Sequence, residues 1–582
     1  MKKTALCLAV LVTVTACSQN QAAHNNAGES ASQPRKARHA DMTRAAEQQT
    51  LVMSAQASQK LAAISYMAPP PSPQQAVSTE NYQDLESHDV ILVSEQPVST
   101  FSSDVDTASY ANIRRFINNG AVPPKDAVRI EEMVNYFHYD YANPSSEQHP
   151  IAVDTLLTTS PWNQQNQIIR IGVSTYQQDT AQRPDANLVF LIDVSGSMQS
   201  KDKLPLLQQS LMLMLDQLRG TDRVSIVTYA SGTQIALKST PVSQKADIQR
   251  AISNLRAGGS THGEAGIELA YQQAAHGFID DGINHVLLMS DGDLNVGIRD
   301  VEQLKDRIKL KRQSGVQFST YGFGRGNYND HLMEQLADHG NGLAGYIDTL
   351  HEAQKLLVDQ IGSSLHTVAH DVKFQVEFNP ALVSEYRLIG YENRQLNRED
   401  FNNDQKDAGD IGAGHTVTAL YEITPVGSQG LVDPLVFQAH DATQYNNHQT
   451  LAEVRVRYKS SQGQASNKII APIDKDQFVE FDAVSQDDRF ALSVAAFGQK
   501  LRGSDYLAQL GYAEIIDWAN QSRGQDPFGY RAEFVKLARL GQVLAEQKSA
   551  VARQPHSEPP IAKQVRPARM KSKAKSTYEL SQ

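Results

Sequence analysis

The sequence predicts an α/β protein, a doubly wound and mostly parallel sheet accompanied by a β-sandwich and helical flanks. Between residues 187 and 364, apolar strands alternate with amphipathic helices, which is the order that a doubly wound sheet requires. After about residue 365, apolar and polar residues alternate with a period of two, as sandwich strands do. Helical spacing of apolar residues marks 101–140 and 485–547.

The strand and helix assignments follow the apolar pattern along the chain. The run 188–192 is continuously apolar, as expected for a strand covered on both faces. Apolar residues of 204–218 fall on one helical stripe. We predict strands at 151–158, 167–175, 188–192, 224–229, 285–289 and 316–321, and helices at 107–118, after Pro124, and at 204–218, 245–255, 264–276, 301–313, 330–338 and 350–363.

The overall composition limits the possible functions. Of the 582 residues, 40% are hydrophobic and 20% are charged, a balance typical of globular proteins. The formal net charge is −11, and we therefore expect no nucleic-acid partner, because binding a phosphate backbone needs a basic surface. The two cysteines both lie within the first 17 residues, so they provide neither a cysteine zinc site nor a disulfide framework.

The N-terminus has the pattern of an export signal. A basic start precedes the apolar run 4–16, which is too short to span a membrane well and is typical of a secretory signal. The run ends in Val-Thr-Ala-Cys, and small residues before Cys17 resemble the bacterial lipobox. That resemblance implies fatty acylation of Cys17, for example with palmitate, and Ser18 after it points to the outer membrane. A plain signal peptide cut near Ala16 is the alternative.

Composition shifts divide the rest of the chain. The segment after the signal is rich in Ser, Gln, Asn and Ala and resembles a flexible tether. The last segment contains seven Lys or Arg against two Glu, which is typical of a disordered tail. We expect a signal peptide (1–16), a tether (17–85), a helical N-terminal flank (86–150), sandwich strands (151–186), the α/β domain (187–364), a β-sandwich region (365–484), a C-terminal helical region (485–550) and a basic disordered tail (551–582).

The strands on either side of the α/β domain need partners. Those at 151–158 and 167–175 are too few to bury a core alone, and those between 371 and 481 expose apolar faces. The simplest solution is one sandwich built from both sets, with 187–364 inserted between them, since domain termini often lie close together. The alternative is an independent β domain after residue 365.

Three polar segments fall where such a sheet places ligands. Asp193-Val194-Ser195-Gly196-Ser197 follows the first strand, Gly258-Gly259-Ser260-Thr261-His262 precedes a helix, and Ser290-Asp291-Gly292 follows a later strand. Carboxyl ends of parallel strands are the usual ligand-binding edge. Together these segments resemble the von Willebrand factor type A domain and its metal-ion-dependent adhesion site. The stretches 101–141, 321–324 and 416–423 look like a family of bacterial von Willebrand A lipoproteins.

The resemblance implies a divalent-cation site. Mg²⁺, or in its place Mn²⁺ or Ca²⁺, would be bound directly by Asp193, Ser195 and Ser197, while Thr261 and Asp291 would act directly or through water. Mg²⁺ prefers six oxygen ligands and usually keeps waters beside one or two carboxylates. An open position could then accept a carboxylate from a protein partner.

Other motifs have simpler explanations. Residues 291–302 superficially match a calcium loop, but Val296 stands where the sharp turn needs glycine. The glycines of 322–326 do not form a dinucleotide-binding pattern, so we predict a turn. His262, next to Thr261, could act as a general base, but a packed or hydrogen-bonded neighbour of the loop is the simpler interpretation.

These features favour a binding module over an enzyme. We expect a lipid-anchored envelope protein that binds an acidic residue of a protein partner through its metal ion, with no small-molecule substrate. The alternative is an accessory subunit or a metal-assisted hydrolytic enzyme of the envelope. No recognisable nucleophile–base motif supports catalysis.

Overall fold

The computed structural model describes residues 79–103, 106–144, 146, 148–177, 183–261, 263–292, 301–406, 408–433, 449–461 and 464–552. These residues all belong to one compact unit, residues 77–582. The signal peptide, nearly all of the tether, the basic tail and His262 lie outside the described residues, so those predictions stay open. Among the described helices, none combines the length and apolarity that a membrane span requires.

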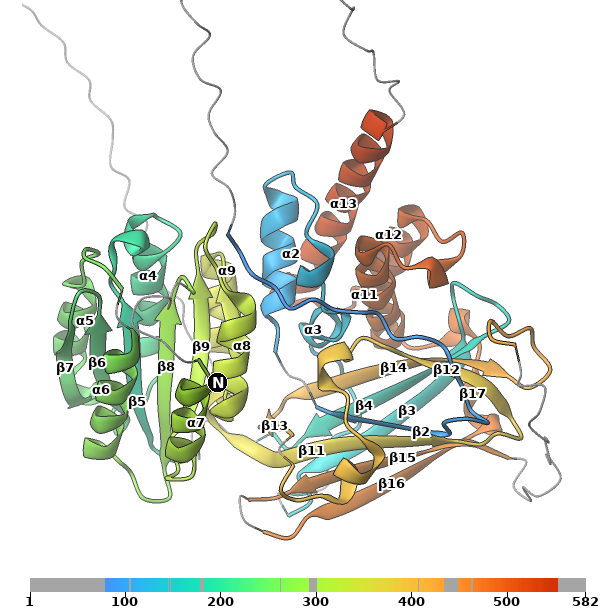
Figure 1. The fold of residues 1–582 in the computed structure, drawn as a ribbon, viewed down its shortest axis with the longest axis horizontal. Helices are drawn as coiled ribbons and strands as arrows, with labels where there is room; N and C mark the ends of the chain where they lie inside the picture. Colours follow the sequence, from blue (N-terminus) through green and yellow to red (C-terminus); the bar gives the residue numbers. More distant parts are fainter. Residues whose placement is uncertain are drawn as a thin grey trace, which may run out of the picture. The chain divides into compact units, whose positions relative to one another are not determined.

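The α/β domain is a doubly wound sheet, as predicted (Figure 1). Its strand order is β10-β9-β8-β5-β6-β7, parallel except for β7, which runs antiparallel to β6. The strands are β5 (Ala186–Asp193), β6 (Arg223–Tyr229), β7 (Thr233–Pro241), β8 (Ile283–Ser290), β9 (Gln317–Phe323) and β10 (Ala344–Ile347).

Helices cover both faces of this sheet (Figure 1). Leu188, Phe190 and Ile192 of β5 pack in one core, while Val189 and Leu191 pack in the other, which explains why this strand is apolar at every position. The helical segments are η2 (Gly196–Gln199), α4 (Leu204–Leu215), η3 (Val242–Gln244), α5 (Lys245–Ser253), α6 (Gly263–His276), α7 (Val301–Arg312), α8 (Asp330–His339), α9 (Leu350–Gln354), η4 (Lys355–Asp359) and α10 (Ile361–Leu365).

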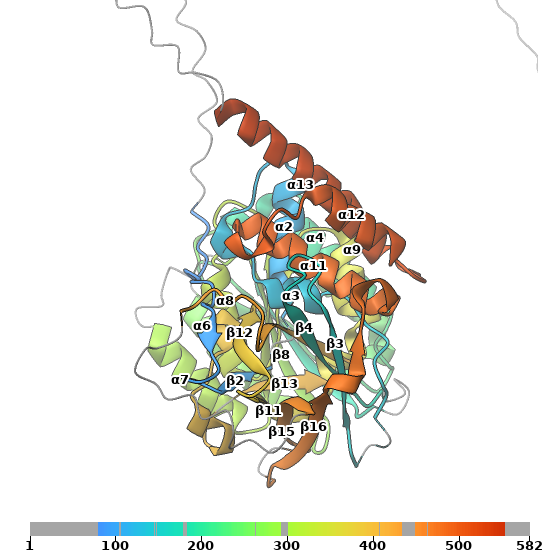
Figure 2. The ribbon, with the colours of Figure 1, turned by 90° about the vertical axis from the view of Figure 1, so that its right-hand side faces the viewer.

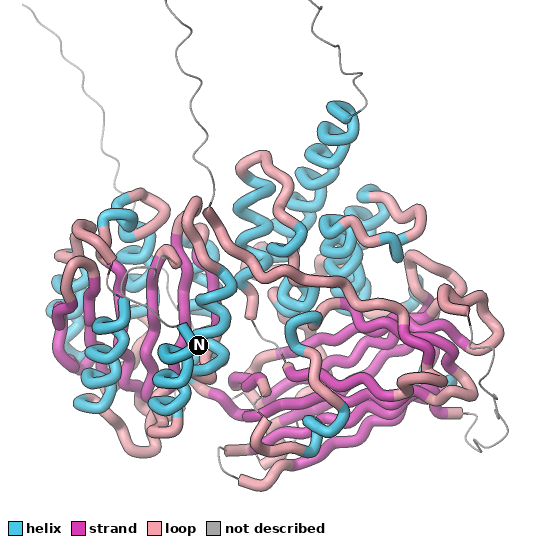
Figure 3. The backbone as a smooth tube through the Cα atoms, viewed as in Figure 1, coloured by secondary structure: helices cyan, strands magenta, loops and turns pink. Residues whose placement is uncertain are grey.

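Two further sheets pack face to face as a sandwich around one shared core (Figures 1 and 3). One has the order β1-β12-β14-β4-β3-β17, and the other has the order β13-β11-β15-β16 with β2 also paired to β11. The strands are β1 (Ile91–Leu92), β2 (Val98–Ser102), β3 (Ile151–Thr159), β4 (Gln167–Thr175), β11 (Thr367–Phe378), β12 (Val383–Ile389), β13 (Gly409–Gly412), β14 (Thr416–Pro425), β15 (Thr450–Lys459), β16 (Asn467–Asp474) and β17 (Phe478–Val479).

The α/β domain is inserted between strands of this sandwich. β4, which precedes the domain, pairs antiparallel with β14, which follows it, in a continuous register from Gln167 opposite Ile423 to Ser174 opposite Thr416. β3 pairs with β4 in turn. The predicted pairing of residues 151–175 with later strands is thus confirmed, and the alternative of an independent β domain after residue 365 is wrong.

Helices from both ends of the described chain form a third core against the sandwich (Figure 2). They are α2 (Ala108–Asn118), α3 (Ile130–Asn135), α11 (Gln486–Arg502), α12 (Tyr512–Gln521) and α13 (Tyr530–Ala552). Their aromatic side chains meet there, as Phe137 does with Phe490 and Phe534. Short turns complete the structure: η1 (Lys125–Ala127), η5 (Glu392–Arg394), η6 (Arg398–Asn402), η8 (Lys475–Gln477), η9 (Phe481–Ala483) and η10 (Asp505–Leu507).

Two details of the sequence prediction were wrong. The helix expected directly after Pro124 is a single 3-10 turn, and the α-helix begins only at Ile130, because Val128 and Arg129 are extended. The strands β7 and β10 were missed. β7 is an edge strand with many exposed positions, so it shows no apolar run, and β10 has only four residues.

Candidate metal centre

The three predicted segments lie on loops at the carboxyl edge of the α/β sheet. Asp193 is the last residue of β5 and Ser290 is the last residue of β8, the neighbouring parallel strand. Thr261 lies just before Gly263, where α6 begins. The parallel sheet therefore brings the segments to one edge, as the strand order requires.

Asp193 is a buried carboxylate, and both of its oxygens accept hydrogen bonds. The backbone N–H of Ser195 donates to Oδ1 at 2.8 Å, and the hydroxyl of Ser290 donates to Oδ2 at 3.1 Å. The side chain is fully buried, and this burial, reinforced by the charge of Asp291, raises the pKa of Asp193 to about 6. Each oxygen keeps a lone pair that could bind a cation.

The two serines place hydroxyl groups beside this carboxylate. Residues 196–199 form the 3-10 turn η2, which brings the hydroxyl oxygens of Ser195 and Ser197 to 2.9 Å from each other. Ser195 is buried, whereas Ser197 is exposed. The pair thus extends from the buried Asp193 to the protein surface.

The loop that contains Thr261 is bonded directly to the first loop. The N–H of Gly258 donates to the carbonyl of Val194 at 2.7 Å, and the N–H of Gly196 donates to the carbonyl of Gly259 at 2.9 Å. Gly259 has a φ of +88°, and a Cβ there would lie 2.4 Å from the hydroxyl of Ser231, so only glycine fits. Thr261 itself is 6% exposed.

Asp291 is paired with a lysine that the sequence analysis did not single out. The ammonium group of Lys203 donates to Oδ2 of Asp291 at 2.8 Å and to Oδ1 of Asn327 at 3.0 Å. Burial alone would raise the pKa of Asp291. The charge and hydrogen bond of Lys203, together with hydrogen bonds from Ser197 and Asn327, hold this pKa below its usual value. Ser197 and Asp291 are therefore neighbours.

The loop that supplies Asn327 is bonded to residues near the start of the described chain. The N–H of Thr79 donates to the carbonyl of Gly326 at 2.9 Å, and the N–H of Asn81 donates to that of Tyr328 at 3.0 Å. The carboxylate of Glu80 accepts from the N–H of Gly326 at 2.7 Å and from both terminal nitrogens of Arg115 at 2.9 Å. Residues 79–81 thus brace one wall of the site.

The donor set suits a hard divalent cation. The structure brings together two carboxylates and the hydroxyls of Ser195 and Ser197, which are oxygen ligands of the kind that Mg²⁺ prefers, and Thr261 lies on the loop that is bonded to them. Within the described ranges, no group of three or more His, Cys, Asp and Glu side chains could hold a metal ion, so an ion here depends on the hydroxyls as well as on Asp193 and Asp291. The residues present fit Mg²⁺.

Lys203 and Asn327 are residues that sequence reasoning missed, and Ser290 was named only as part of its segment, without a role in the site. One signal for Lys203 was available, because it is the N-cap residue of α4, where the helix dipole disfavours a cation. A lysine at such a position suggests a nearby anion. Asn327 left no such signal, since it reaches the site only through the fold.

Of the two other loop motifs in the sequence, the glycine turn is confirmed and the calcium-loop match is not tested. Gly324 and Gly326 have φ values of +75° and +95°, so residues 322–326 contain a glycine turn, as predicted. Residues 293–300 of the calcium-loop match lie outside the described residues.

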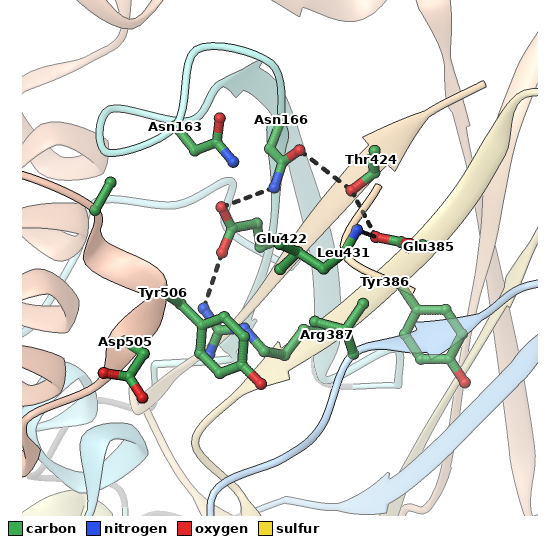
Figure 4. A pocket seen from close by; sticks show the side chains of 12 residues that line it. Asn163, Asn166, Glu385, Tyr386, Arg387, Glu422, Thr424, Leu431, Asp505 and Tyr506 are labelled. Carbon is green, nitrogen blue, oxygen red and sulfur yellow. Dashed lines mark hydrogen bonds and ion pairs between the residues drawn. The ribbon is translucent and has the colours of Figure 1, made fainter. Parts of the chain in front are cut away.

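Away from the metal site, a cavity of about 150 Å³ lies between the sandwich and η10 (Figure 4). Two of its carboxylates, those of Glu422 and Glu385, are satisfied by the chain itself. Glu422 accepts from Trp162 at 3.0 Å, from Asn166 at 3.2 Å and from Arg387 at 2.8 Å, and Glu385 accepts from the backbone N–H groups of Leu431 and Val432 at 3.0 and 2.8 Å. We interpret this network as structural.

A doubly wound sheet with this loop cluster defines a von Willebrand factor type A domain. The family profile described as von Willebrand factor type A domain matches residues 187–360, and the profile described as von Willebrand factor matches residues 76–170. A third, described as the C-terminal part of the uncharacterized protein YfbK, matches residues 363–544. Domains of this class typically bind divalent metals and other proteins.

The chain belongs to the YfbK family of bacterial von Willebrand factor type A proteins. It is 47% identical over 475 residues to the uncharacterized protein YfbK of Escherichia coli (strain K12), an alignment that covers 80% of this chain and 82% of that protein.

A more distant relative matches a smaller part of the chain. Inter-alpha-trypsin inhibitor heavy chain H3 of Rattus norvegicus is 25% identical over 167 residues, 27% of this chain and 18% of that protein. The solved structure of von Willebrand factor type A from Catenulispora acidiphila shares 16% identity with a TM-score of 0.38, and covers 69% of this chain and 91% of that one.

Proposed function

We propose that this protein is a lipid-anchored binding protein of the cell envelope, whose von Willebrand factor A domain holds Mg²⁺ and through it binds a carboxylate of a protein partner. The observation that supports it best is Asp193, a fully buried carboxylate that accepts hydrogen bonds from Ser195 and Ser290. A buried carboxylate is costly unless its charge is compensated, and a cation would supply that compensation.

The five residues have distinct roles in this proposal. Asp193, Ser195 and Ser197 bind the ion directly, with Asp193 as the charged ligand. Thr261 offers a further hydroxyl, and Asp291 contributes its charge directly or through water. When bound, the ion supplies a positive charge with a position open to an outside ligand.

The partner's group is expected to be a carboxylate, because it is the hard anionic oxygen ligand available on protein surfaces. Ser197 is the exposed member of the set, so a partner would approach from its side. Contact through the ion would make the complex sensitive to chelators.

Attachment to the membrane rests on Cys17. Acyl chains contribute about 0.8 kcal/mol for each buried CH₂ group, so more than one chain anchors a protein firmly. We propose the outer membrane as its location. Cys17→Ser should abolish fatty-acid labelling and leave the protein soluble or uncleaved, whereas membrane retention of a processed form of this variant would refute the anchor.

The metal site is tested by titrating the metal-free protein with Mg²⁺ in a calorimeter. Asp193→Ala should weaken Mg²⁺ binding at least about a hundredfold, since it removes a charged ligand from a buried position. Ser195→Ala combined with Ser197→Ala should also weaken it. Asp247→Ala, which removes a half-exposed carboxylate on α5, is the matched control and should have no effect. Equal affinity of wild type and Asp193→Ala would reject the site.

Partner binding needs a separate experiment. Wild type and Asp193→Ala are each used to capture proteins from envelope extracts, with Mg²⁺ and with EDTA. A partner retained by wild type only when Mg²⁺ is present supports the proposal. Equal retention in all four arms would mean that the metal site is not the binding surface.

A further inference from the structure

The ammonium group of Lys203 is built into the metal site. Only 6% of Lys203 is exposed, and Asp291 is fully buried. The ammonium lies between the side-chain oxygens of Asp291 and Asn327, at 2.8 and 3.0 Å. A contact this short between buried groups is weakly screened by solvent and salt.

The path of the lysine stem is fixed by Gly324. This glycine has a φ of +75°, and a Cβ at its position would lie 2.3 Å from Cγ and Cε of Lys203. Any larger residue would displace the stem. The backbone turn after β9 therefore keeps the ammonium beside Asp291.

The other cations near this loop do not share the role. Lys201 is exposed, and Arg325 lies 3.9 Å from the carboxylate of Asp202 with 64% of its own side chain exposed. Lys203 is thus the buried cation among the described residues that contacts either carboxylate of the site.

We propose that Lys203 is a positioning residue that holds Asp291 away from direct coordination and lowers the intrinsic affinity of the site for Mg²⁺. This inference rests on the proposed function. Asp291, already neutralised by the ammonium, contributes through water, and Asp193 is the carboxylate of the site for which no cation is in contact among the described residues. The resident positive charge also repels a divalent cation at short range.

The consequence is a site that binds its metal weakly until a partner arrives. One uncompensated carboxylate leaves a bound Mg²⁺ with a net charge of about +1, which a partner's carboxylate would neutralise. Because binding free energies are reciprocal, a partner that tightens the ion must itself be bound more tightly when the ion is present. Lys203 therefore sets how strongly the two binding events depend on each other.

The test compares Mg²⁺ titrations of wild type, Lys203→Met and Lys203→Gln. Lys203→Met keeps an unbranched stem against Gly324 but has no charge, and Lys203→Gln keeps N–H donors for Asp291 and Asn327. Both should bind Mg²⁺ about tenfold more tightly or better, because a nearby positive charge is removed. Lys201→Met, which removes the same charge from an exposed position of the same loop, should change affinity less than about twofold.

Thermal unfolding provides a second measurement of Mg²⁺ binding, which can be used even if a Lys203 variant is less stable than wild type. Unfolding is followed in EDTA and at increasing Mg²⁺, and the rise in midpoint temperature with Mg²⁺ should be larger for both Lys203 variants than for wild type. A merely structural role for Lys203 would damage the site and make this rise smaller.

The outcomes separate the two proposals. If wild type binds Mg²⁺ and the Lys203 variants bind it equally or more weakly, the role of Lys203 is wrong and the metal site stands. If wild type and Asp193→Ala both fail to bind Mg²⁺, the proposed function fails and the inference fails with it.

Discussion

Two buried charge clusters of this molecule are built differently. The metal-site cluster is Asp193, Asp291 and Lys203. The other, which we name the junction cluster, is Arg114 of α2 with three carboxylates, those of Asp348, Glu352 and Glu533. Arg114 is 1% exposed, its Nε donates to Asp348 at 3.0 Å, and its terminal nitrogens donate to Glu352 and Glu533 at 2.8 and 2.9 Å.

The two clusters differ in how many carboxylates their cation contacts. In the junction cluster one guanidinium serves carboxylates from α9, α13 and the loop after β10, and it also donates to the hydroxyl of Tyr136 at 3.1 Å. Burial alone would lower the pKa of Arg114, but the charges of Asp348 and Glu352 hold it above its ordinary value, so the guanidinium stays charged. In the metal-site cluster, Lys203 contacts Asp291, and within the described part of the chain no cation contacts Asp193. The junction cluster is closed, in that its carboxylates are paired with a cation of the fold, and it joins segments of the chain. The metal-site cluster is open, in that Asp193 remains available to bind a metal ion.

The largest expected effect is the loss of the junction cluster. Arg114→Met should destabilise the protein by about 3–5 kcal/mol, because it leaves buried carboxylates unpaired. Urea unfolding in metal-free buffer measures this, and Mg²⁺ affinity of the folded variant should be unchanged. If Arg114→Met costs less than about 1 kcal/mol, the cluster does not join these segments.

A second buried group tests whether the α/β sheet itself is sensitive to acid. Burial lowers the pKa of His285 on β8 to about 4, below the ordinary 6.5. The folded state therefore binds fewer protons, and stability present above pH 6.5 is lost as the pH falls toward 4. The loss is about 3 kcal/mol at most.

The measurement is the stability difference between wild type and His285→Gln at pH 7 and at pH 4. This difference should shift by about 3 kcal/mol in favour of the variant in acid. Asp193, with its raised pKa, contributes the opposite slope in both proteins and cancels. A difference that does not change with pH would show that the ring is solvated.

The open cluster should cost stability when no ion is bound. Asp193→Asn should stabilise the metal-free protein by about 1 kcal/mol at pH 7.5, because it removes a buried charge whose pKa is raised. The same variant should lose the stabilisation that Mg²⁺ gives to wild type. Calorimetric melting with EDTA and with Mg²⁺ measures both, and a destabilised variant in EDTA would contradict the comparison.

The smallest effect is expected at an exposed ion pair. Lys245 contacts Asp216, with side chains 42% and 61% exposed. Lys245→Met should change stability by less than about 0.5 kcal/mol, measured in the same urea series. A larger loss would mean that the contrast between the clusters does not depend on burial.

The sequence predicted what is encoded locally. Continuous apolar runs identified β5 and β8, and the loop after each strand end gave Asp193 and Asp291. The unpaired faces of residues 151–175 were enough to predict that they share a sandwich with the strands after the α/β domain, although the pairing of β4 with β14 in particular was not predicted. The junction cluster could not be predicted, because Arg114 and Glu533 are 419 residues apart and no local sequence pattern indicates that they are in contact. Lys203 was missed for a related reason, since its partner Asn327 lies 124 residues further along the chain.

Residues 79–81 give the metal site a mechanical connection. They are the first described residues of the chain, and their hydrogen bonds attach to Gly326 and Tyr328, on either side of Asn327. Tension on the chain upstream of Thr79 therefore reaches the loop beside the ammonium of Lys203 before it reaches the strands. If, as proposed, Cys17 is held in a membrane and a partner is bound at the ion, a stretching force would load this loop first. The affinity for the partner would then depend on force as well as on concentration.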